Sequence, residues 1–163
     1  MDAKTLIRQT IATTEMICNT YLADLTDEDL LHRPVAGANH INWQWGHLIA
    51  SEKMLGDLVK PGAMPSLPEG FEEKYGKETA AVDDADQFAT KAELQAAQQT
   101  QREALMALLD NLSVEELSNP APEQMAAFFP NAASLILSAD SHWMMHAGQW
   151  AVVRRALGKP PLF

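Results

Sequence analysis

Hydrophobic residues recur at helical spacing in four long segments of the chain, and no segment shows the alternation of a strand. The recurring positions are Leu6, Ile7, Thr10, Thr14, Ile17, Tyr21 and Leu22; Ile41, Trp45, Leu48, Glu52, Leu55 and Val59; Leu94, Ala97, Gln101, Leu105, Leu108 and Leu112; and Leu135, Ala139, His142, His146, Trp150, Val153 and Leu157. The second segment stops at Pro61-Gly62, and the fourth starts near Asn131 and ends at Gly158 before two prolines. The pattern therefore predicts an all-α protein with four long helices.

The connections between these segments suggest how the helices are paired. Two similar stretches, 25–30 and 112–117, follow the first and third helices, and Ser113 with Glu116 fits a capping box. A proline-rich stretch from Lys60 to about Asp86 separates the second and third helices, either to cover a site or to cross the length of the molecule. We expect two helical hairpins joined by this long crossover loop, forming a four-helix bundle.

The length of 163 residues fits one domain, residues 1–163, with 47% hydrophobic residues to form a core. The formal net charge is −10, and no lysine or arginine cluster offsets it. Phosphate backbones are repelled by such a surface, so nucleic acid is excluded as a partner. The adjacent pair Arg154-Arg155 falls in the last turn of the predicted fourth helix, where the helix dipole favours cations.

Cysteine usage and hydropathy indicate the cytoplasm. The single cysteine, Cys18, excludes an internal disulfide, and we expect it to be a small buried side chain of the first helix rather than a reactive thiol. The apolar runs are only a few residues long, so no membrane span is expected. The first helix, with Asp2, Lys4 and Arg8, lacks the hydrophobic region of a signal peptide.

Candidate chemistry lies in the fourth helix, where His142 and His146 stand four residues apart in the apolar stripe. This spacing places both imidazoles on one helical face, where they can converge on one metal ion. His47 in the second helix is a third candidate ligand. Alternatively, each histidine is a hydrogen-bonded core residue. His32 and His40 precede the second helix and are expected to be surface or capping residues.

Three imidazoles without a fourth protein ligand are typical of a catalytic rather than a structural metal site. The ligand type suits zinc or nickel, and also iron. Other chemistries lack their motifs: the chain has no Glu-x-x-His pair of the di-iron bundles, no Cys-x-x-Cys-His haem attachment, no glycine-rich phosphate loop and no Gly-x-Ser-x-Gly. The sequence therefore predicts a divalent transition metal at His47, His142 and His146 and assigns no separate catalytic residue.

Several residues near these histidines have two interpretations. Glu52 is expected to be either a partner of an imidazole or a surface carboxylate, and Gln149 either a hydrogen-bonding group of the site or a structural residue. The tryptophans in these segments are expected to pack in the core, with pocket lining as the alternative; they are Trp43, Trp45, Trp143 and Trp150.

Three segments of this chain resemble the DinB-like superfamily of four-helix-bundle proteins. They are Asn42–Ile49, His142–Gln149 and Arg154–Pro161, the last similar to an Arg-x-x-Gly-x-Pro ending. The resemblance spans nearly the whole chain in helix order and loop lengths. It implies a metal held by one histidine of the second helix and two of the fourth, which match His47, His142 and His146.

The resemblance also implies an activity. Relatives transfer or isomerise small-molecule substrates with a low-molecular-weight thiol such as mycothiol, bacillithiol or glutathione, and many are homodimers. It does not imply DNA binding. We therefore expect a metal-dependent thiol transferase. The alternatives are a non-catalytic metal-binding stress or interaction protein and a metal-dependent hydrolase.

Overall fold

The computed structural model describes residues 2–163, which are mostly helical and contain no strand. The four long helices are α1 (Ala3–Leu22), α3 (Ile41–Val59), α5 (Lys91–Asn111) and α6 (Ala132–Ala156). The short elements are α2 (Asp27–Leu30), α4 (Phe71–Lys74) and the 3-10 turns η1 (Lys77–Thr79), η2 (Ala85–Gln87) and η3 (Glu116–Ser118). The prediction of an all-α protein is confirmed. Over residues 2–163, no helix combines the length and hydrophobicity needed to cross a lipid bilayer.

Each long helix begins at a residue whose side chain accepts a backbone N–H of the first turn. Asp2 does this for α1, His40 for α3, Thr90 for α5 and Asn131 for α6. These contacts satisfy donors that have no partner inside the helix. At the other end of α6, Gly158 has a φ of +73°, a conformation that glycine adopts without steric cost. The helix boundaries are thus determined locally, and they agree with the expected ones.

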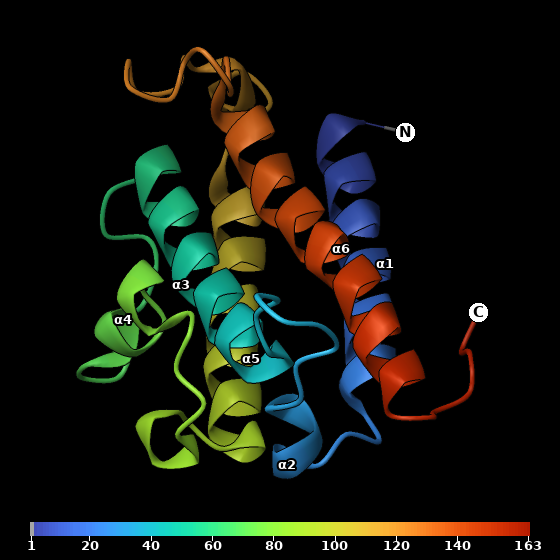
Figure 1. The fold of residues 1–163 in the computed structure, drawn as a ribbon. Coiled ribbons are helices and arrows are strands. Elements are labelled where there is room, and N and C mark those ends of the chain that lie inside the picture. Colours follow the sequence, from blue (N-terminus) through green and yellow to red (C-terminus); the bar gives the residue numbers. More distant parts are fainter. Residues whose placement is uncertain (1) are drawn as a thin grey trace.

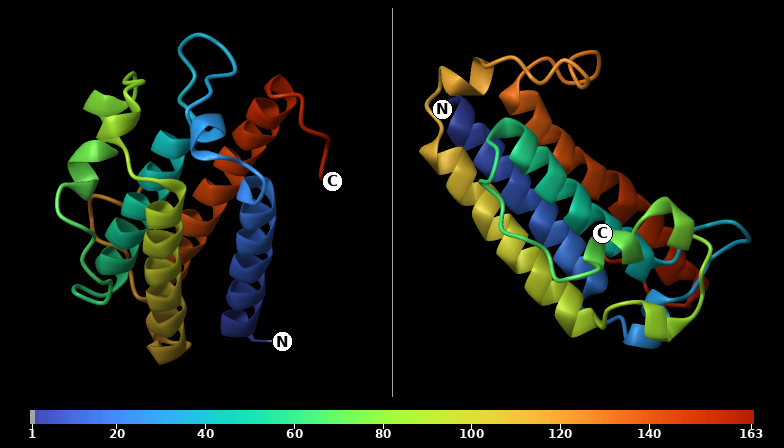
Figure 2. Two further views of the ribbon diagram at one scale, coloured as in Figure 1. Left: turned by 90° about the horizontal axis from the view of Figure 1, so that it is seen from below. Right: turned by 90° about the vertical axis from the view of Figure 1, so that its left-hand side faces the viewer.

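The pairing of the helices differs from the predicted hairpins. α6 packs against α1 and α3, and α5 packs against α3 and, less closely, α1 (Figure 1, Figure 2). α1 and α6 run in one direction, and α3 and α5 run in the other. α1 therefore lies diagonally opposite α3, and α5 lies diagonally opposite α6, whereas the consecutive helices α3 and α5 are neighbours. The connections 23–40 and 112–131 are long enough to allow this, so neither forces the two helices it joins into contact.

The connection between α3 and α5, residues 60–90, crosses the length of the molecule, which is one of the two roles expected for it (Figure 1). It runs from the end of α3 to the opposite end of the molecule, where α5 begins (Figure 1). It also packs on α3, because the Tyr75 hydroxyl donates to Oδ1 of Asn42 and the Trp43 indole donates to the carbonyl of Gly76. A Cβ at Gly46 would lie 2.2 Å from the Tyr75 ring, so only glycine fits there. The loop thereby supports the helix face that carries His47.

The buried stripe of α1 is shifted from the expected one. Its buried residues are Ile7, Ile11, Thr14, Cys18 and Leu22. Leu6 is 57% exposed, because the face of α1 that meets α6 and α5 lies one position further along the helix. The burial of Cys18 is confirmed, and it raises the pKa of the thiol to about 12. Such a thiol is not reactive at neutral pH.

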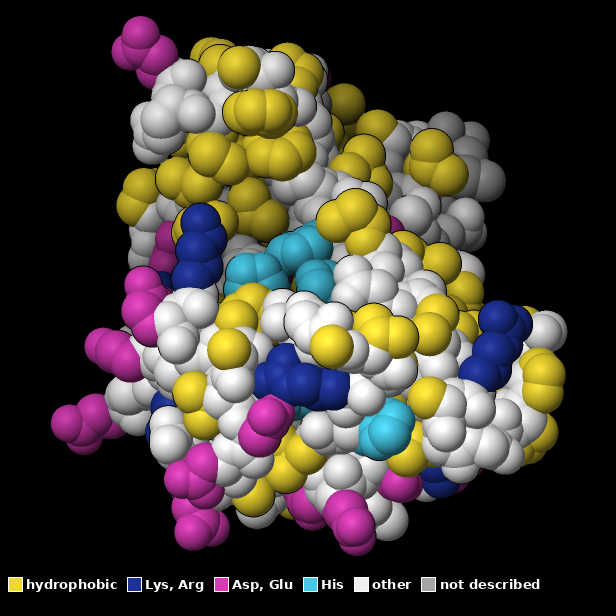
Figure 3. Space-filling view, in the orientation of Figure 1, with side chains coloured by type: hydrophobic (Ala, Val, Ile, Leu, Met, Phe, Trp, Pro, Cys, Tyr) yellow, Lys and Arg dark blue, Asp and Glu magenta, His cyan; other side chains and the backbone are white. Residues whose placement is uncertain are grey.

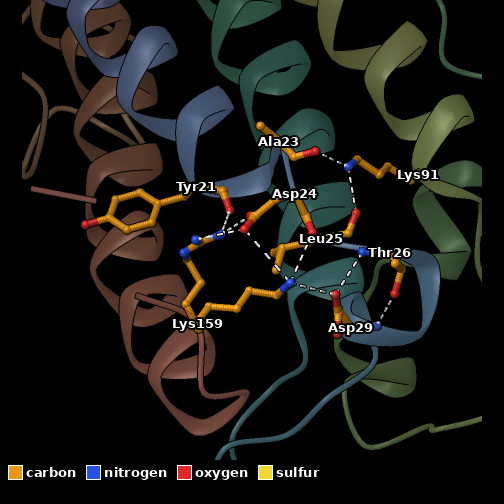
Figure 4. Close-up of polar contacts among 9 residues, drawn as sticks. Tyr21, Ala23, Asp24, Leu25, Thr26, Asp29, Lys91 and Lys159 are labelled. Carbon is orange, nitrogen blue, oxygen red and sulfur yellow. Dashed lines mark hydrogen bonds and ion pairs between the residues drawn. The ribbon is translucent and has the colours of Figure 1, made fainter. Parts of the chain in front are cut away.

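Arg154 has a larger role than the helix dipole suggested. It is only 2% exposed, and its guanidinium donates to the Asp24 carboxylate and to the carbonyl of Tyr21 (Figure 4). Lys159 lies 3.3 Å from the carboxylate of Asp29 in the same network. These contacts attach the end of α6 to the segment that follows α1.

Candidate metal centre

Three histidines that are distant in sequence converge between α3 and α6. His47 comes from α3, and His142 and His146 come from successive turns of α6. One nitrogen of each lies within 4.8 Å of the corresponding nitrogens of the other two. The ring centroids of His47 and His142 are 5.2 Å apart, and those of His142 and His146 are 5.0 Å apart. The structure thus brings together all three candidate ligands.

The site is open to solvent on one side. All three histidines are partly exposed, whereas the core-facing residues of the same two helices are buried. Figure 3 shows histidine side chains gathered in a hollow on the face formed by α3 and α6, with hydrophobic side chains along its upper border. A small molecule can therefore approach these rings from outside.

The imidazoles are neutral at neutral pH. Burial lowers the pKa of His47, and burial together with the neighbouring His47 lowers the pKa of His142. The pKa of His146 falls to about 4, because burial and the two other histidines all disfavour its charged form. A metal ligand must be an unprotonated nitrogen, so the site is ready for a cation without releasing protons.

Gln44 determines the tautomer of His146. Its side-chain oxygen lies 2.9 Å from Nδ1 of His146 and also accepts the indole N–H of Trp150, while its amide nitrogen donates to the carbonyl of Asn39. The Asn39 and Trp150 contacts identify the atom facing His146 as the oxygen. Nδ1 of His146 must therefore carry the proton, which leaves Nε2 with the free lone pair.

Trp43 supports His47 in a different way. The two rings stack in parallel, with centroids 4.9 Å apart and planes inclined by 5°. The Trp43 indole donates to Gly76 and to the hydroxyl of Thr79, so its position is fixed by the loop between α3 and α5. Trp43 thus lines the site, whereas Trp45, Trp143 and Trp150 are buried core residues as expected.

The predictions for other residues near the site are corrected in part. Glu52 is neither a partner of an imidazole nor a surface carboxylate: it is 1% exposed and pairs with Arg102, with an N–O distance of 2.8 Å. It lies on the opposite side of α3 from His47, because five residues correspond to about 140° of rotation beyond one full turn. Gln149 is exposed and makes no side-chain hydrogen bond within the described part of the chain. His40 does cap α3, but it is fully buried rather than at the surface.

Gln44 is the supporting residue that the sequence analysis did not identify. The sequence did contain a signal for Gln44, since it precedes His47 by three residues and so shares its helical face. A buried amide among hydrophobic side chains needs polar partners, and here an imidazole is one of them.

The fold and these histidines define a helical protein with a candidate three-histidine metal centre on one face. Comparison with protein families assigns residues 10–150 to the DinB superfamily, and the chain belongs to this family. A solved structure, described as the crystal structure of the conserved protein of locus from Enterococcus faecalis, is similar with a TM-score of 0.72 and 18% identity. The alignment covers 98% of this chain and 99% of that chain, and at this identity it shows a shared fold. No protein with a curated function matches the sequence.

Proposed function

We propose that this protein is a metal-dependent enzyme whose metal is held by His47, His142 and His146 within a four-helix bundle. The observation that supports this most strongly is the convergence of three neutral imidazole nitrogens within 4.8 Å on an open face. Three protein ligands leave positions for a substrate or cofactor, as catalytic sites require. Zinc or nickel suits such ligands best, and iron is a third choice.

Each residue of the site has a defined part in this proposal. The three histidines would hold the cation, Gln44 presents Nε2 of His146 to it, and Trp43 keeps the His47 ring in place while shielding one of its faces from water. The metal, when bound, would lower the pKa of a coordinating thiol so that the thiolate persists at neutral pH.

We propose thiol transfer as the reaction. A low-molecular-weight thiol loses its proton to solvent, its sulfur forms a bond to an electrophilic carbon of a small substrate, and the leaving group departs with the electron pair of the broken bond. The hydrophobic border of the hollow is suited to the carbon skeleton of such a substrate. A reducing cytoplasm, where low-molecular-weight thiols are abundant, is the compartment that this reaction needs.

Two alternatives make different predictions for the same face. A hydrolase would place water where the thiol binds, and a non-catalytic metal-binding protein would leave the hollow without a ligand. The openness of the site favours either enzyme over the non-catalytic role. Replacing the metal by cobalt(II) makes the ligand set visible in the absorption spectrum.

The test is a titration of the cobalt-loaded protein with glutathione, bacillithiol and mycothiol. Thiol transfer predicts a new sulfur-to-cobalt absorption band with at least one of these thiols and none with their S-methyl derivatives. A His32→Ala variant is the matched control, because His32 lies outside the site. Loss of the thiol-dependent band is expected in His47→Ala. A spectrum that no thiol changes would contradict thiol transfer.

We also propose that the chain forms a homodimer through the outer face of α6. Leu137, Met144 and Val152 are exposed and recur along this helix, and Gly148 between them has open space around it. From residue 132 to 153 the only charged residue is Asp140, which is buried. Two copies could therefore pack without bringing like charges together, despite the net charge of −10. Sedimentation should show a dimer that Met144→Glu dissociates, and a monomeric parent would refute it.

A further inference from the structure

The loop between η3 and α6, residues 119–131, projects on the face that carries the three histidines (Figure 2, Figure 3). Its two ends are held together, since the backbone N–H of Ala132 donates to the carbonyl of Asn119 at 2.9 Å. Its tip is closed by the backbone N–H of Phe129, which donates to the carbonyl of Met125, also at 2.9 Å. The loop is therefore an ordered extension of the bundle beside the candidate metal centre.

The inner side of the 119–131 loop packs on α3 and α6. Met125 and Phe129 contact a small buried cluster, whose members are Leu55 of α3, Leu135 and Ala139 of α6, and Ala121 of the loop itself. Ala139 precedes His142 by three residues, so the two lie on the same side of α6 and about 4.5 Å apart along its axis. The apolar surface under the loop thus begins within one helical turn of the histidine site.

Large apolar side chains remain exposed at this place. Phe128 in the loop is 80% exposed, and the centroid of its ring lies 6.4 Å from that of Phe129. Met54 of α3 is also exposed, and it follows His47 by seven residues, which is two helical turns along the same face. Figure 3 shows hydrophobic side chains above the histidines. Exposed apolar groups that gather beside a candidate site are typical of a ligand-binding surface.

The segments around the histidines carry almost no charge. Residues 124–153 include one charged residue, Asp140, and its side chain is buried. Residues 41–51 of α3 include none, and Lys53, which follows them, is paired with Asp57 at 3.1 Å. Away from the metal, a charged group of a ligand would lose water here without gaining a partner of opposite charge. This surface therefore favours a neutral, apolar ligand.

We infer that the electrophile of the proposed thiol transfer is a neutral compound with an aromatic ring, and that Phe128 and Phe129 bind this ring while the reactive carbon faces the histidines. Two phenylalanine rings offer the edge and face contacts that aromatic groups prefer. The exposed Met54 would contact the ligand from α3, since methionine sulfur interacts favourably with aromatic rings. The inference rests on the proposed function for the reaction and adds the class of substrate. Phe128 and Phe129 would select the substrate without taking part in its chemistry.

The test measures the binding of three unreactive probes to the full, metal-free chain by NMR of isotope-labelled methionine methyl groups. Phenylbutanol, with its ring and hydroxyl at opposite ends, is neutral and aromatic; phenylbutyrate has a carboxylate in place of the hydroxyl, and butanol lacks the ring. Phenylbutanol should shift the Met54 and Met125 signals saturably and bind about tenfold or more tightly than either other probe. Met106, on α5, should not respond. Equal binding of the three probes, or a shift at Met106 alone, would overturn the inference.

Variants assign the aromatic ring to the loop. Phe128→Ala should weaken phenylbutanol binding about fivefold, the usual contribution of an aromatic pair, and should fold normally because the side chain is exposed. Phe163→Ala removes a similarly exposed ring, beside Tyr21, and should leave binding unchanged. Parental binding by Phe128→Ala, or a change from dimer to monomer in place of weaker binding, would overturn the inference. The metal-free measurement is separate from the proposed function, because a cobalt spectrum that no thiol changes would refute the reaction and leave the aromatic-binding surface standing.

Discussion

The amide oxygen of Gln44 lies 2.9 Å from Nδ1 of His146 and links the core of the protein to the three-histidine site. Gln44 is 1% exposed and is bound on its other sides by Trp150 and Asn39. A ring whose Nδ1 donates to a fixed acceptor can offer only Nε2 to a cation. The core packing of α3 and α6 thereby sets the orientation of the His146 ring on the open face.

Replacing Gln44 should weaken metal binding without removing a ligand. Gln44→Met keeps the size of the side chain but loses the acceptor, so both ring tautomers of His146 become accessible. We expect the affinity for zinc to fall roughly 10–100-fold. The zinc affinity of each variant is measured by competition with a chromophoric chelator. Gln149→Met, at an exposed position of α6, is the control, and equal affinities of both variants and the parent would refute this role.

Acid should destabilise the metal-free protein through His146. Its pKa is about 4 in the folded protein, against an ordinary value of 6.5, so the unfolded chain takes up this proton first as the pH falls. The contribution of this group to the free energy of unfolding is therefore complete above pH 6.5 and declines as the pH falls toward 4. Urea unfolding at a series of pH values should show a steeper decline for the parent than for His146→Gln. Parallel curves would contradict the assignment.

The close approach of Tyr75 to α3 can be tested with a pair of glycines. In Gly46→Ala the new Cβ would collide with the Tyr75 ring, and we expect a loss of about 1–3 kcal/mol in the free energy of unfolding. Gly148→Ala on α6 meets nothing within 4 Å and should be stabilising by about 0.5–1 kcal/mol, the usual preference for alanine in a helix. Thermal or urea unfolding distinguishes the two, and similar effects at both positions would argue against the packing described here.

The buried pair Glu52–Arg102 should respond asymmetrically to substitution. Arg102→Met leaves a buried carboxylate whose pKa burial already raises to about 7, and we expect a loss of roughly 3–5 kcal/mol near neutral pH. The double variant Glu52→Leu/Arg102→Met removes both charges and should recover most of this loss. If the double variant is as unstable as the sum of the single ones, the two residues do not interact.

The sequence was sufficient for the features that depend on local chemistry. Capping residues such as Asn131 and the periodicity of α3 and α6 determine the long helices, and the i, i+4 spacing places His142 and His146 on one face. The pairing of helices was not predictable in this way, because connections of this length allow either a neighbouring or a diagonal partner. The positions of Glu52 and Gln44 depend on that pairing, since each faces a side chain on a different helix.

The central claim is that His47, His142 and His146 bind one metal ion, and mass spectrometry of the purified, untagged protein tests it most directly. After exposure to zinc or nickel and removal of the excess, the parent and His32→Ala should retain about one equivalent, the amount that one such site holds. The double variant His142→Ala/His146→Ala should retain none while keeping the helical circular dichroism of the parent. A parent that takes up neither metal would contradict the account, and the three histidines would then be packing residues at the surface between α3 and α6.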